Sequence, residues 1–273
     1  MNDNDDIRGG AGAAPLAPEV AWPAGARCLV AAQCMVAVGS IDAKGAAWAS
    51  LLFGKPGFLR ANDEPAVRIE MPAKERDLAD PAWENMAPGA DLGMLFIDFA
   101  TRRRYRVNGT VQRLDRRGAE VEVRAAQPGC PRHLARRAPR LLGEPRLPVQ
   151  TAHGALVRGA VERIVRRADT VFVASRHPVH GVDAAHRGGA PGFVELAGPA
   201  TLRIPDLPGS HPSSTLDNFR YDERAGICIS DSEHGQVLQL TGRARIVEGL
   251  AWEFEVSRWI LRDMPRAIAW DAA

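Results

Sequence analysis

The sequence predicts a mainly β protein that is built from two related halves. The first observation is a succession of short apolar stretches separated by Gly, Pro, Asn and Asp, the residues that favour turns. The second is period-two alternation, which places Tyr105 and Val107 on one face of a strand and Val121 and Val123 on one face of the next. The third is an internal repeat.

These patterns predict several short strands in each half, together with short helices. In the first half, strands are expected over residues 46–53, 58–62, 66–71, 94–99, 103–112 and near 121–124, with a short helix over 80–86. In the second half, an amphipathic helix is expected over 154–168, followed by strands over 170–174, 194–196, 201–204, 226–230, 236–247 and at least one more within 252–270.

The repeat is visible when Val36 is aligned with Val171, an offset of 135 residues. Residues 54–58 then align with 189–193, and a two-residue deletion changes the offset to 133 for the remainder. The pairs that match are mostly structural residues, namely Ser40 with Ser175, Pro72 with Pro205, Asn85 with Asn218, Gly93 with Gly226, Asp98 with Asp231 and Gly109 with Gly242. A duplication predicts two similar units related by a pseudo-twofold axis, the fused counterpart of a homodimer.

Composition divides the chain into four regions. Residues 1–26 are acidic and then rich in Gly, Ala and Pro, which predicts a flexible N-terminus. The first half is expected over 27–125 and the second over 154–273. Between them, residues 126–153 form a linker rich in Pro and Arg, because five prolines interrupt any long element there.

Charge and cysteine usage argue against several function classes. The chain has 35 basic and 33 acidic residues, a formal net charge of +2, so neither nucleic acid nor a membrane surface is an expected partner. Its four cysteines form no C-x-x-C pair, and no segment resembles a signal peptide or a membrane span, so a cytoplasmic protein with reduced thiols is expected. The histidines between 177 and 186 are interpreted as loop residues, and no metal site is predicted.

An ordered set of motifs resembles a known family. In the second half these are residues 183–194 (DAAHRGGAPGFV), 202–206 (LRIPD), 215–218 (TLDN), 224–229 (RAGICI) and 238–244 (LQLTGRA). The first half shows the companion pattern at 48–52 (WASLL), 56–58 (PGF) and 104–109 (RYRVNG), and 129–133 (GCPRH) lies between them. Together they resemble the predicted flavin-nucleotide-binding branch of the pyridoxamine 5′-phosphate oxidase-like superfamily, over roughly residues 27–270.

This resemblance implies a six-stranded split barrel in each half, FMN at the interface between the halves, and redox chemistry on a small-molecule substrate. It does not imply which substrate. The segment after Asp206 departs from the family pattern, because it continues as Ser210-His211-Pro212-Ser213-Ser214.

The residues also indicate how FMN could be held. A phosphate group needs a cation together with hydroxyl or backbone N–H donors, which a helix N-terminus supplies well. The predicted cofactor-binding residues are Arg187, Gly188, Gly189, Asp206, Ser210, Ser213, Ser214 and Thr215 in the second half, with Ser50 and Lys55 in the first. No catalytic side chain is assigned, because the flavin itself carries the chemistry.

The two halves differ where the phosphate is expected. His186, Arg187 and Gly188 align with Leu51, Leu52 and Phe53, so only the second half offers a cation. One FMN per chain is therefore expected, with its phosphate on the second half.

Three functions remain open from the sequence. The first is an FMN-dependent oxidoreductase that works with a small electron donor or with a reductase partner. The second is a non-catalytic carrier of flavin or haem, and the third is a cofactor-free remnant of the fold. Pairing of the fused pseudo-dimer into a further homodimer is left open.

Overall fold

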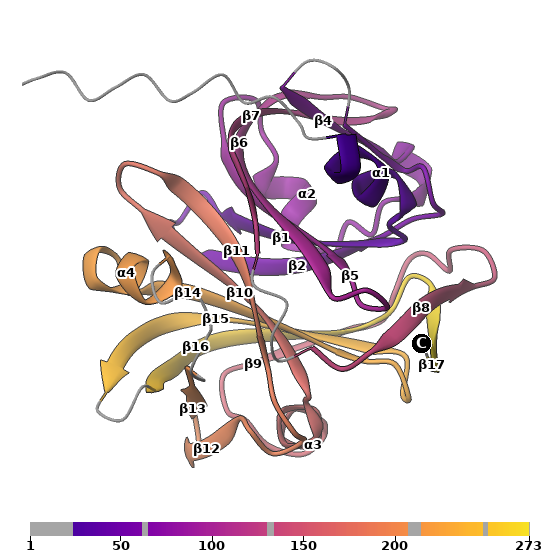
Figure 1. Ribbon diagram of the computed structural model, residues 1–273. Helices are drawn as coiled ribbons and strands as arrows, with labels where there is room; N and C mark the ends of the chain where they lie inside the picture. Colours follow the sequence, from indigo (N-terminus) through magenta and orange to yellow (C-terminus); the bar gives the residue numbers. More distant parts are fainter. Residues whose placement is uncertain (1–23, 62–64, 130–133, 207–213, 248–250, 273) are drawn as a thin grey trace, which may run out of the picture.

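Figure 1 shows a computed structural model, which describes residues 24–61, 65–129, 134–206, 214–247 and 251–272. Several predicted features lie outside the described residues, namely most of the N-terminal segment, the basic residues Arg132 and His133, and the site candidates Ser210 and Ser213.

The elements of the first half are α1 (Ala24–Ala32), β1 (Met35–Ile41), β2 (Ala47–Phe53), β3 (Leu59–Ala61), β4 (Ala66–Glu70), the 3-10 helix η1 (Ala73–Glu75), α2 (Pro81–Asn85), β5 (Asp91–Asp98), β6 (Arg103–Leu114) and β7 (Gly118–Pro128).

The second half repeats most of this succession after two connecting elements. The connecting elements are β8 (Arg137–Leu142) and β9 (Thr151–Gly154), and α3 (Ala160–Arg167), which aligns with α1 under the offset of 135, opens the second half. They are followed by β10 (Thr170–His177), β11 (Gly181–Gly188), β12 (Glu195–Gly198), β13 (Thr201–Pro205), α4 (Ser214–Tyr221), β14 (Arg224–Asp231), β15 (Gln236–Val247), β16 (Ala251–Asp263) and β17 (Ala267–Ala272). The mainly β fold class predicted from the sequence is confirmed.

The two large sheets have the same strand order. The first runs β2-β1-β5-β6-β7-β4-β3 and the second β11-β10-β14-β15-β16-β13-β12, with every pairing antiparallel. In the described residues neither path closes on itself, as in an open, split barrel. Residues 54–58 follow β2 and residues 189–193 follow β11, so the repeated segment occupies the same topological position in both halves.

The repeated glycines make the same contacts in both halves. Gly54 lies against the ring of Phe58 and Gly189 against that of Phe193, where an added Cβ would come within 2.3 and 2.6 Å of the ring or its Cβ. Likewise, a Cβ on Gly109 or Gly242 would clash with the carbonyl oxygen of the strand beside it. Each of the latter two glycines sits at a register shift of its strand pair, where only a residue without a side chain fits.

A buried Ser–Asn hydrogen bond is also duplicated. Asn85 Nδ2 donates to Ser40 Oγ at 3.0 Å, and Asn218 Nδ2 donates to Ser175 Oγ at 2.8 Å. Each bond ties the short helix of its half, α2 or α4, to the strand β1 or β10 beneath it. Two independently chosen β units would not place the same buried pair at matching positions, so this bond supports the duplication.

The halves meet face to face across β1, β2 and β5 on one side and β10, β11 and β14 on the other (Figure 1). Gly93 on β5 faces the backbone of Asp183, and Gly226 on β14 faces the backbone of Trp48. These two contacts correspond under the repeat, because residue 48 aligns with 183. Each half has its own apolar core, and a third apolar cluster, which includes Leu51, Phe172 and Cys228, fills the interface.

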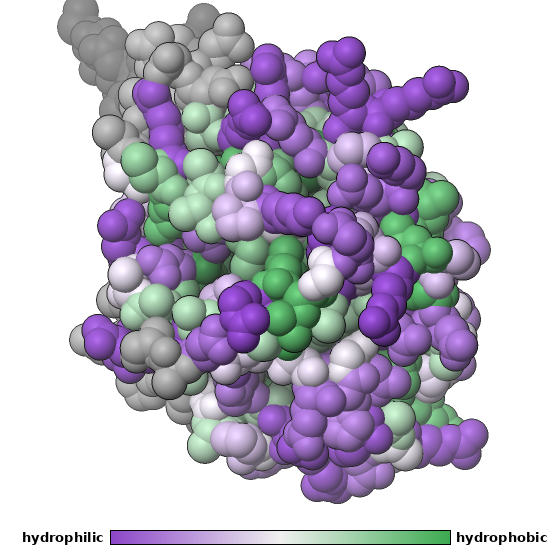
Figure 2. All heavy atoms as spheres, turned by 90° about the vertical axis from the view of Figure 1, so that its right-hand side faces the viewer, coloured by the Kyte–Doolittle hydropathy of each residue, from purple (hydrophilic) through white to green (hydrophobic). Residues whose placement is uncertain are grey.

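The linker is docked rather than extended. β8 pairs with the C-terminal β17, and β9 adds to the outer side of β16. Arg137 forms a two-point ion pair with Asp169, and its guanidinium lies 4.1 Å from the ring of Trp270. Among its described residues the segment contains no helix, but residues 126–128 belong to β7, which lies between β6 and β4, and Pro139 lies within β8. In Figure 2, which faces the side carrying β8 and β17, hydrophobic residues form separate groups among hydrophilic ones.

One expected element is shorter than predicted. The helix expected over 154–168 occupies only residues 160–167, because Gly154 ends β9 and Gly159, with a φ of 60°, precedes the first helical turn. The apolar period includes Leu156, but this side chain lies outside the helix and is 47% exposed. Among the described residues, no helix is long and apolar enough to cross a membrane.

The close approach of the two halves can be tested at its two glycines. We expect Gly93→Ala and Gly226→Ala each to lower the free energy of unfolding by about 1–3 kcal/mol, the usual cost of overpacking. The reason is that the new Cβ would lie 2.6–2.7 Å from main-chain atoms of the other half, which cannot rotate away. Urea unfolding measures the effect. Gly198→Ala is the control, because its nearest neighbour would be 3.5 Å away. Equal stabilities for all three variants would contradict the packing.

Candidate functional site

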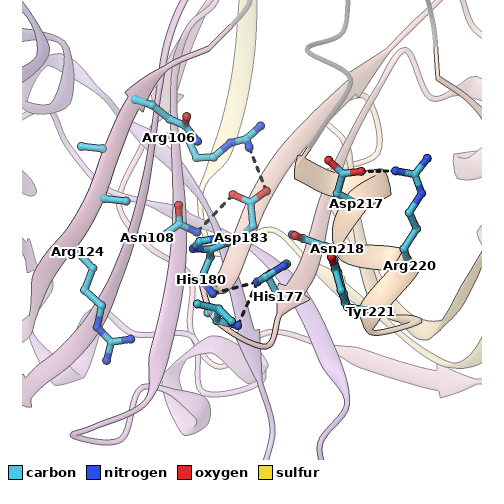
Figure 3. A pocket seen from close by; sticks show the side chains of 15 residues that line it. Arg106, Asn108, Arg124, His177, His180, Asp183, Asp217, Asn218, Arg220 and Tyr221 are labelled. Atoms are coloured by element: carbon cyan, nitrogen blue, oxygen red, sulfur yellow. Dashed lines mark hydrogen bonds and ion pairs between the residues drawn. The ribbon is translucent and has the colours of Figure 1, made fainter. Parts of the chain in front are cut away.

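A cleft of about 850 Å³ opens between the two halves. One wall comes from β6 and β7 of the first half, and the other from the β10–β11 turn, β11 and α4 of the second (Figure 3). Its lining residues are Arg106, Asn108, Arg124, Ala125, Ala126, Gln127, His177, Val179, His180, Gly181, Asp183, Asp217, Asn218, Arg220 and Tyr221. The volume lies in the upper part of the range of about 300–1,000 Å³ that is typical of small-molecule sites.

A polar contact between the halves forms the inner part of the cleft. Arg106 on β6 pairs with Asp183 on β11, with Nη1 and Oδ2 3.3 Å apart. The Asp183 side chain is only 5% exposed and that of Arg106 19%. Asn108 Nδ2 donates to the carbonyl oxygen of Val182 at 2.5 Å. This charged pair joins the two halves, so both halves contribute to the site.

Three rings stand side by side at the outer end of the cleft. His177 stacks on His180 with ring centroids 4.4 Å apart, and Tyr221 meets His177 edge-on at 4.8 Å. His177 Nδ1 accepts the backbone N–H groups of Val179 and His180, at 3.1 and 3.2 Å. Because Nδ1 is an acceptor, the proton of the neutral ring is on Nε2. His177 is the last residue of β10 and His186 lies within β11, so only His180 has the loop position expected from the sequence for these histidines. No group of three potential metal ligands occurs among the described residues.

Arg187 lies deeper in the second half and already has a counterion. Its Nε is 2.8 Å from Asp206 Oδ1, and both side chains are less than a tenth exposed. Burial lowers the pKa of Arg187, Asp206 opposes this effect, and the like charge of Arg106 adds to it. The charge of Arg106 on the cleft floor therefore affects the pKa of Arg187, although Arg187 does not line the cleft. The Thr215 hydroxyl, near the start of α4, is buried and has no hydrogen-bond partner in the described structure.

The other predicted phosphate residues are distributed unevenly. Gly188 ends β11 next to Arg187, while the absence of a side chain at Gly189 is already required by Phe193. Ser214 begins α4, directly before Thr215. The structure thus groups Arg187, Gly188 and Asp206 along β11 and the end of β13, and places Ser214 and Thr215 at the first turn of α4.

Ser50 and Lys55 do not join this group. Ser50 is fully buried, donates to Asp80 Oδ1 at 2.5 Å and accepts from Gln239 Nε2 at 2.9 Å. Lys55 is on the surface, where it pairs with Glu144 at 2.8 Å. In the described structure no hydrogen bond or ion pair connects either residue to Arg187 or Asp206.

Among the described residues, the position that corresponds to the cleft floor under the repeat holds a buried polar network. Asp183 aligns with Trp48, and Arg106 aligns with Gln239. There, Arg262 of β16 forms ion pairs with Asp77 and Asp80, and its Nε donates to Gln239 Oε1 at 2.9 Å. Asp80 also caps α2 by accepting the N–H of Ala82 at 3.0 Å.

This buried network consists of Ser50, Asp77, Asp80, Gln239 and Arg262. Asp80 and Arg262 are each 1% exposed. Two carboxylates and a guanidinium are therefore buried beside Gln239, the residue that aligns with Arg106 of the cleft. A phosphate group at the N-terminus of α2 would meet two negative charges.

Sequence reasoning did not single out Arg106, Asn108 or Tyr221 as site residues. Arg106 and Asn108 belong to the 104–109 motif, and Asp183 opens the 183–194 motif, so the motifs contained part of the signal. Arg106 and Asn108 lie next to Asp183 because β6 contacts β11, and these two strands are far apart in sequence and in different halves. No periodicity within one strand reveals such a contact.

Comparisons with known proteins give a weak structural likeness only. No protein-family profile and no curated protein matches the chain. Among solved structures, a variant of HupZ from Group A Streptococcus is 12% identical, covers 39% of this chain and 99% of its own, and has a TM-score of 0.33.

Two further structures are similar at a comparable level. A putative 5-nitroimidazole antibiotic resistance protein from Bacteroides thetaiotaomicron is 10% identical over 46% of this chain and 93% of its own, with a TM-score of 0.29. MrkH from K. pneumonia, in complex with c-di-GMP, is 8% identical over 84% and 78%, with a TM-score of 0.22. At such scores, the argument for a function must come from the site itself.

The buried network predicts a large effect for loss of its cation. We expect Arg262→Met to lower the free energy of unfolding by about 3–5 kcal/mol, because Asp77 and Asp80 would remain buried without a counterion. Chemical unfolding measures the change. Arg243→Met is the matched control, since its pair with Glu223 is exposed, and it should cost less than about 1 kcal/mol. Similar small effects in both variants would show that the network does not stabilise the interface.

The same network predicts a pH dependence. Burial, together with the nearby charge of Asp80, raises the pKa of Asp77 above its ordinary value of 3.8, although Arg262 opposes this. The folded state therefore holds this proton more tightly than the unfolded state, and the contribution of Asp77 to stability falls as pH rises from the unfolded pKa through the folded one. The difference in unfolding free energy, wild type minus Asp77→Asn, should decrease as the pH rises above the ordinary pKa of 3.8. Urea unfolding at several pH values measures it, and a difference that rises with pH would contradict the direction of the shift.

Proposed function

We propose that the chain is an FMN-binding oxidoreductase that acts on a small molecule in the cleft between its halves. The observation that carries this proposal is the contrast between two positions related by the repeat. One is filled by the buried network around Arg262, whereas the other is an open cleft with an Arg–Asp pair at its floor. When bound, FMN supplies the transfer of a hydride or of electrons.

The residues beside the cleft fit the groups of FMN. Arg187 supplies a buried cation for the phosphate, and Thr215 supplies a buried hydroxyl that has no partner in the described structure. Arg106 and Asn108 present donors at the floor, which suit the carbonyl oxygens of an isoalloxazine ring. Because a buried hydroxyl without a partner is costly, an anion that accepts from Thr215 would be favoured there.

Asp206 modifies this arrangement. Its carboxylate already neutralises Arg187, so a phosphate must share the guanidinium with it or displace it. The proposed role of Asp206 is therefore to hold Arg187 in place and to limit the affinity for anions. This role differs from direct contact with the cofactor.

Titration of the protein with FMN tests the assignment. We expect one FMN per chain, and Arg187→Ala should weaken binding by at least about tenfold, the value of one charge-assisted hydrogen bond. Asp206→Asn should strengthen FMN binding while lowering stability, because Arg187 loses its counterion but gains freedom to bind phosphate. Leu52→Ala, at the position that aligns with Arg187, is the control and should change stability more than affinity.

Two results would overturn the assignment, namely a stoichiometry of two or an unchanged affinity in Arg187→Ala. Anaerobic addition of NADH or NADPH to the FMN complex then tests the oxidoreductase step, read as loss of the flavin absorbance. Reduction supports turnover with a small electron donor. Reduction that requires an added reductase supports a protein partner, and a flavin that neither system reduces supports a carrier.

A further inference from the structure

We propose that the outer part of the cleft binds a planar aromatic carboxylate. The site consists of an aromatic rim, formed by His177, His180 and Tyr221, and of two guanidinium groups, those of Arg124 and Arg220. That this ligand is the substrate rests on the proposed function. The evidence for the binding site does not depend on it.

The aromatic rim is exposed where a soluble protein usually hides such groups. Tyr221 is 68% exposed and Val179, at the same end of the cleft, is 78% exposed. Figure 3 shows His177, His180 and Tyr221 together at one end of the cleft, below Asp183 and Asn218. Aromatic side chains gain most when another flat ring packs against them, in a stacked or an edge-to-face arrangement. Exposed rings that line a cleft therefore favour a planar ligand.

The polar groups that line the cleft are mainly hydrogen-bond donors. His177 offers its Nε2 proton, because Nδ1 is engaged with two backbone N–H groups. Arg124 and Arg220 add guanidinium donors, and Gln127 adds an amide. Of the charged lining residues three are arginines and two are aspartates, and Asp183 is already paired with Arg106. Such a set matches a ligand rich in acceptors.

The two outer arginines are available at little energetic cost. Arg124 pairs with Asp91 at 2.9 Å and Arg220 with Asp217 at 2.5 Å, and both arginine side chains are more than half exposed. Exposed ion pairs of this kind contribute only about 0–1 kcal/mol. A ligand carboxylate can therefore replace or share either partner and gain the two-point geometry that guanidinium groups favour.

The residues argue against a cationic ligand or a metal ion. The buried carboxylate of the cleft is held by Arg106, and that of Asp217 is held by Arg220. In the part of the chain that the structure describes, no three His, Cys, Asp or Glu side chains gather as a metal site would require. The exposed rings then remain to bind the apolar face of an organic anion.

The test uses 2-naphthoate as the probe and 2-naphthamide as its neutral match, with binding to the full chain measured by calorimetry. We expect 2-naphthoate to bind at least about tenfold more tightly than 2-naphthamide, since one charge-assisted hydrogen bond accounts for such a ratio. Tyr221→Ala should weaken both probes, whereas Arg124→Gln and Arg220→Gln should weaken only the carboxylate. Arg245→Gln is the control, because its exposed pair with Glu253 lies away from the cleft lining.

Each outcome decides the inference. Equal affinity for the two probes, or unchanged affinity in Tyr221→Ala and both arginine variants, would overturn it. Competition with FMN separates it from the proposed function. If 2-naphthoate still binds in the presence of saturating FMN, the outer site is distinct from the flavin site and the inference holds. If FMN displaces 2-naphthoate, the rim belongs to the flavin site and the inference is wrong. If FMN itself does not bind while 2-naphthoate does, the proposed function fails and this site stands.

Discussion

The close packing of one half against the other is the constraint on which the rest of the structure depends. Gly93 and Gly226 allow the backbones of β5 and β14 to touch the backbones of β11 and β2 in the opposite half. This approach buries the edge strands β2 and β11, which would otherwise expose unpaired peptide groups. It also brings β6 of the first half to β11 of the second, so that Arg106 and Asp183 can meet.

Duplication followed by divergence explains how such an interface acquires one open cleft. In a symmetric dimer both grooves would carry the same side chains. In the fused chain, the first-half position has gained Trp48 and Asp80, and the C-terminal β16 contributes Arg262 to fill it. The matching position keeps smaller or polar side chains at the floor, and it stays open. The buried charges around Arg262 thus connect the two halves at one of the two positions, and the cleft beside the Arg106–Asp183 pair is the proposed ligand site at the other.

Much of the fold could be predicted from the sequence, because the signals are local. Glycines at 54, 109, 189 and 242 mark turns and bulges, and the alternation in β6 and β7 marks strands. The repeat was readable because the residues that fix the backbone matched, including the Ser–Asn pair of each half. The first residue of α3 could not be predicted, because the apolar period includes Leu156. In the structure, Gly159 precedes the first helical turn, so the helix does not extend back to Leu156. The site was only partly predictable. Arg187 and Asp206 belong to motifs, but their pairing depends on a contact between distant segments. The same holds for the burial of Ser50 and for the surface ion pair of Lys55.

We propose that two positions related by the repeat differ in function, one as a ligand-binding cleft and the other as a buried network that connects the halves. A crystal structure of the protein grown with FMN tests it most directly. The account predicts electron density for one flavin per chain, beside the Arg106–Asp183 pair, with the guanidinium of Arg262 still bound to Asp77 and Asp80. A flavin that displaces Arg262, or flavins in both positions, would contradict it.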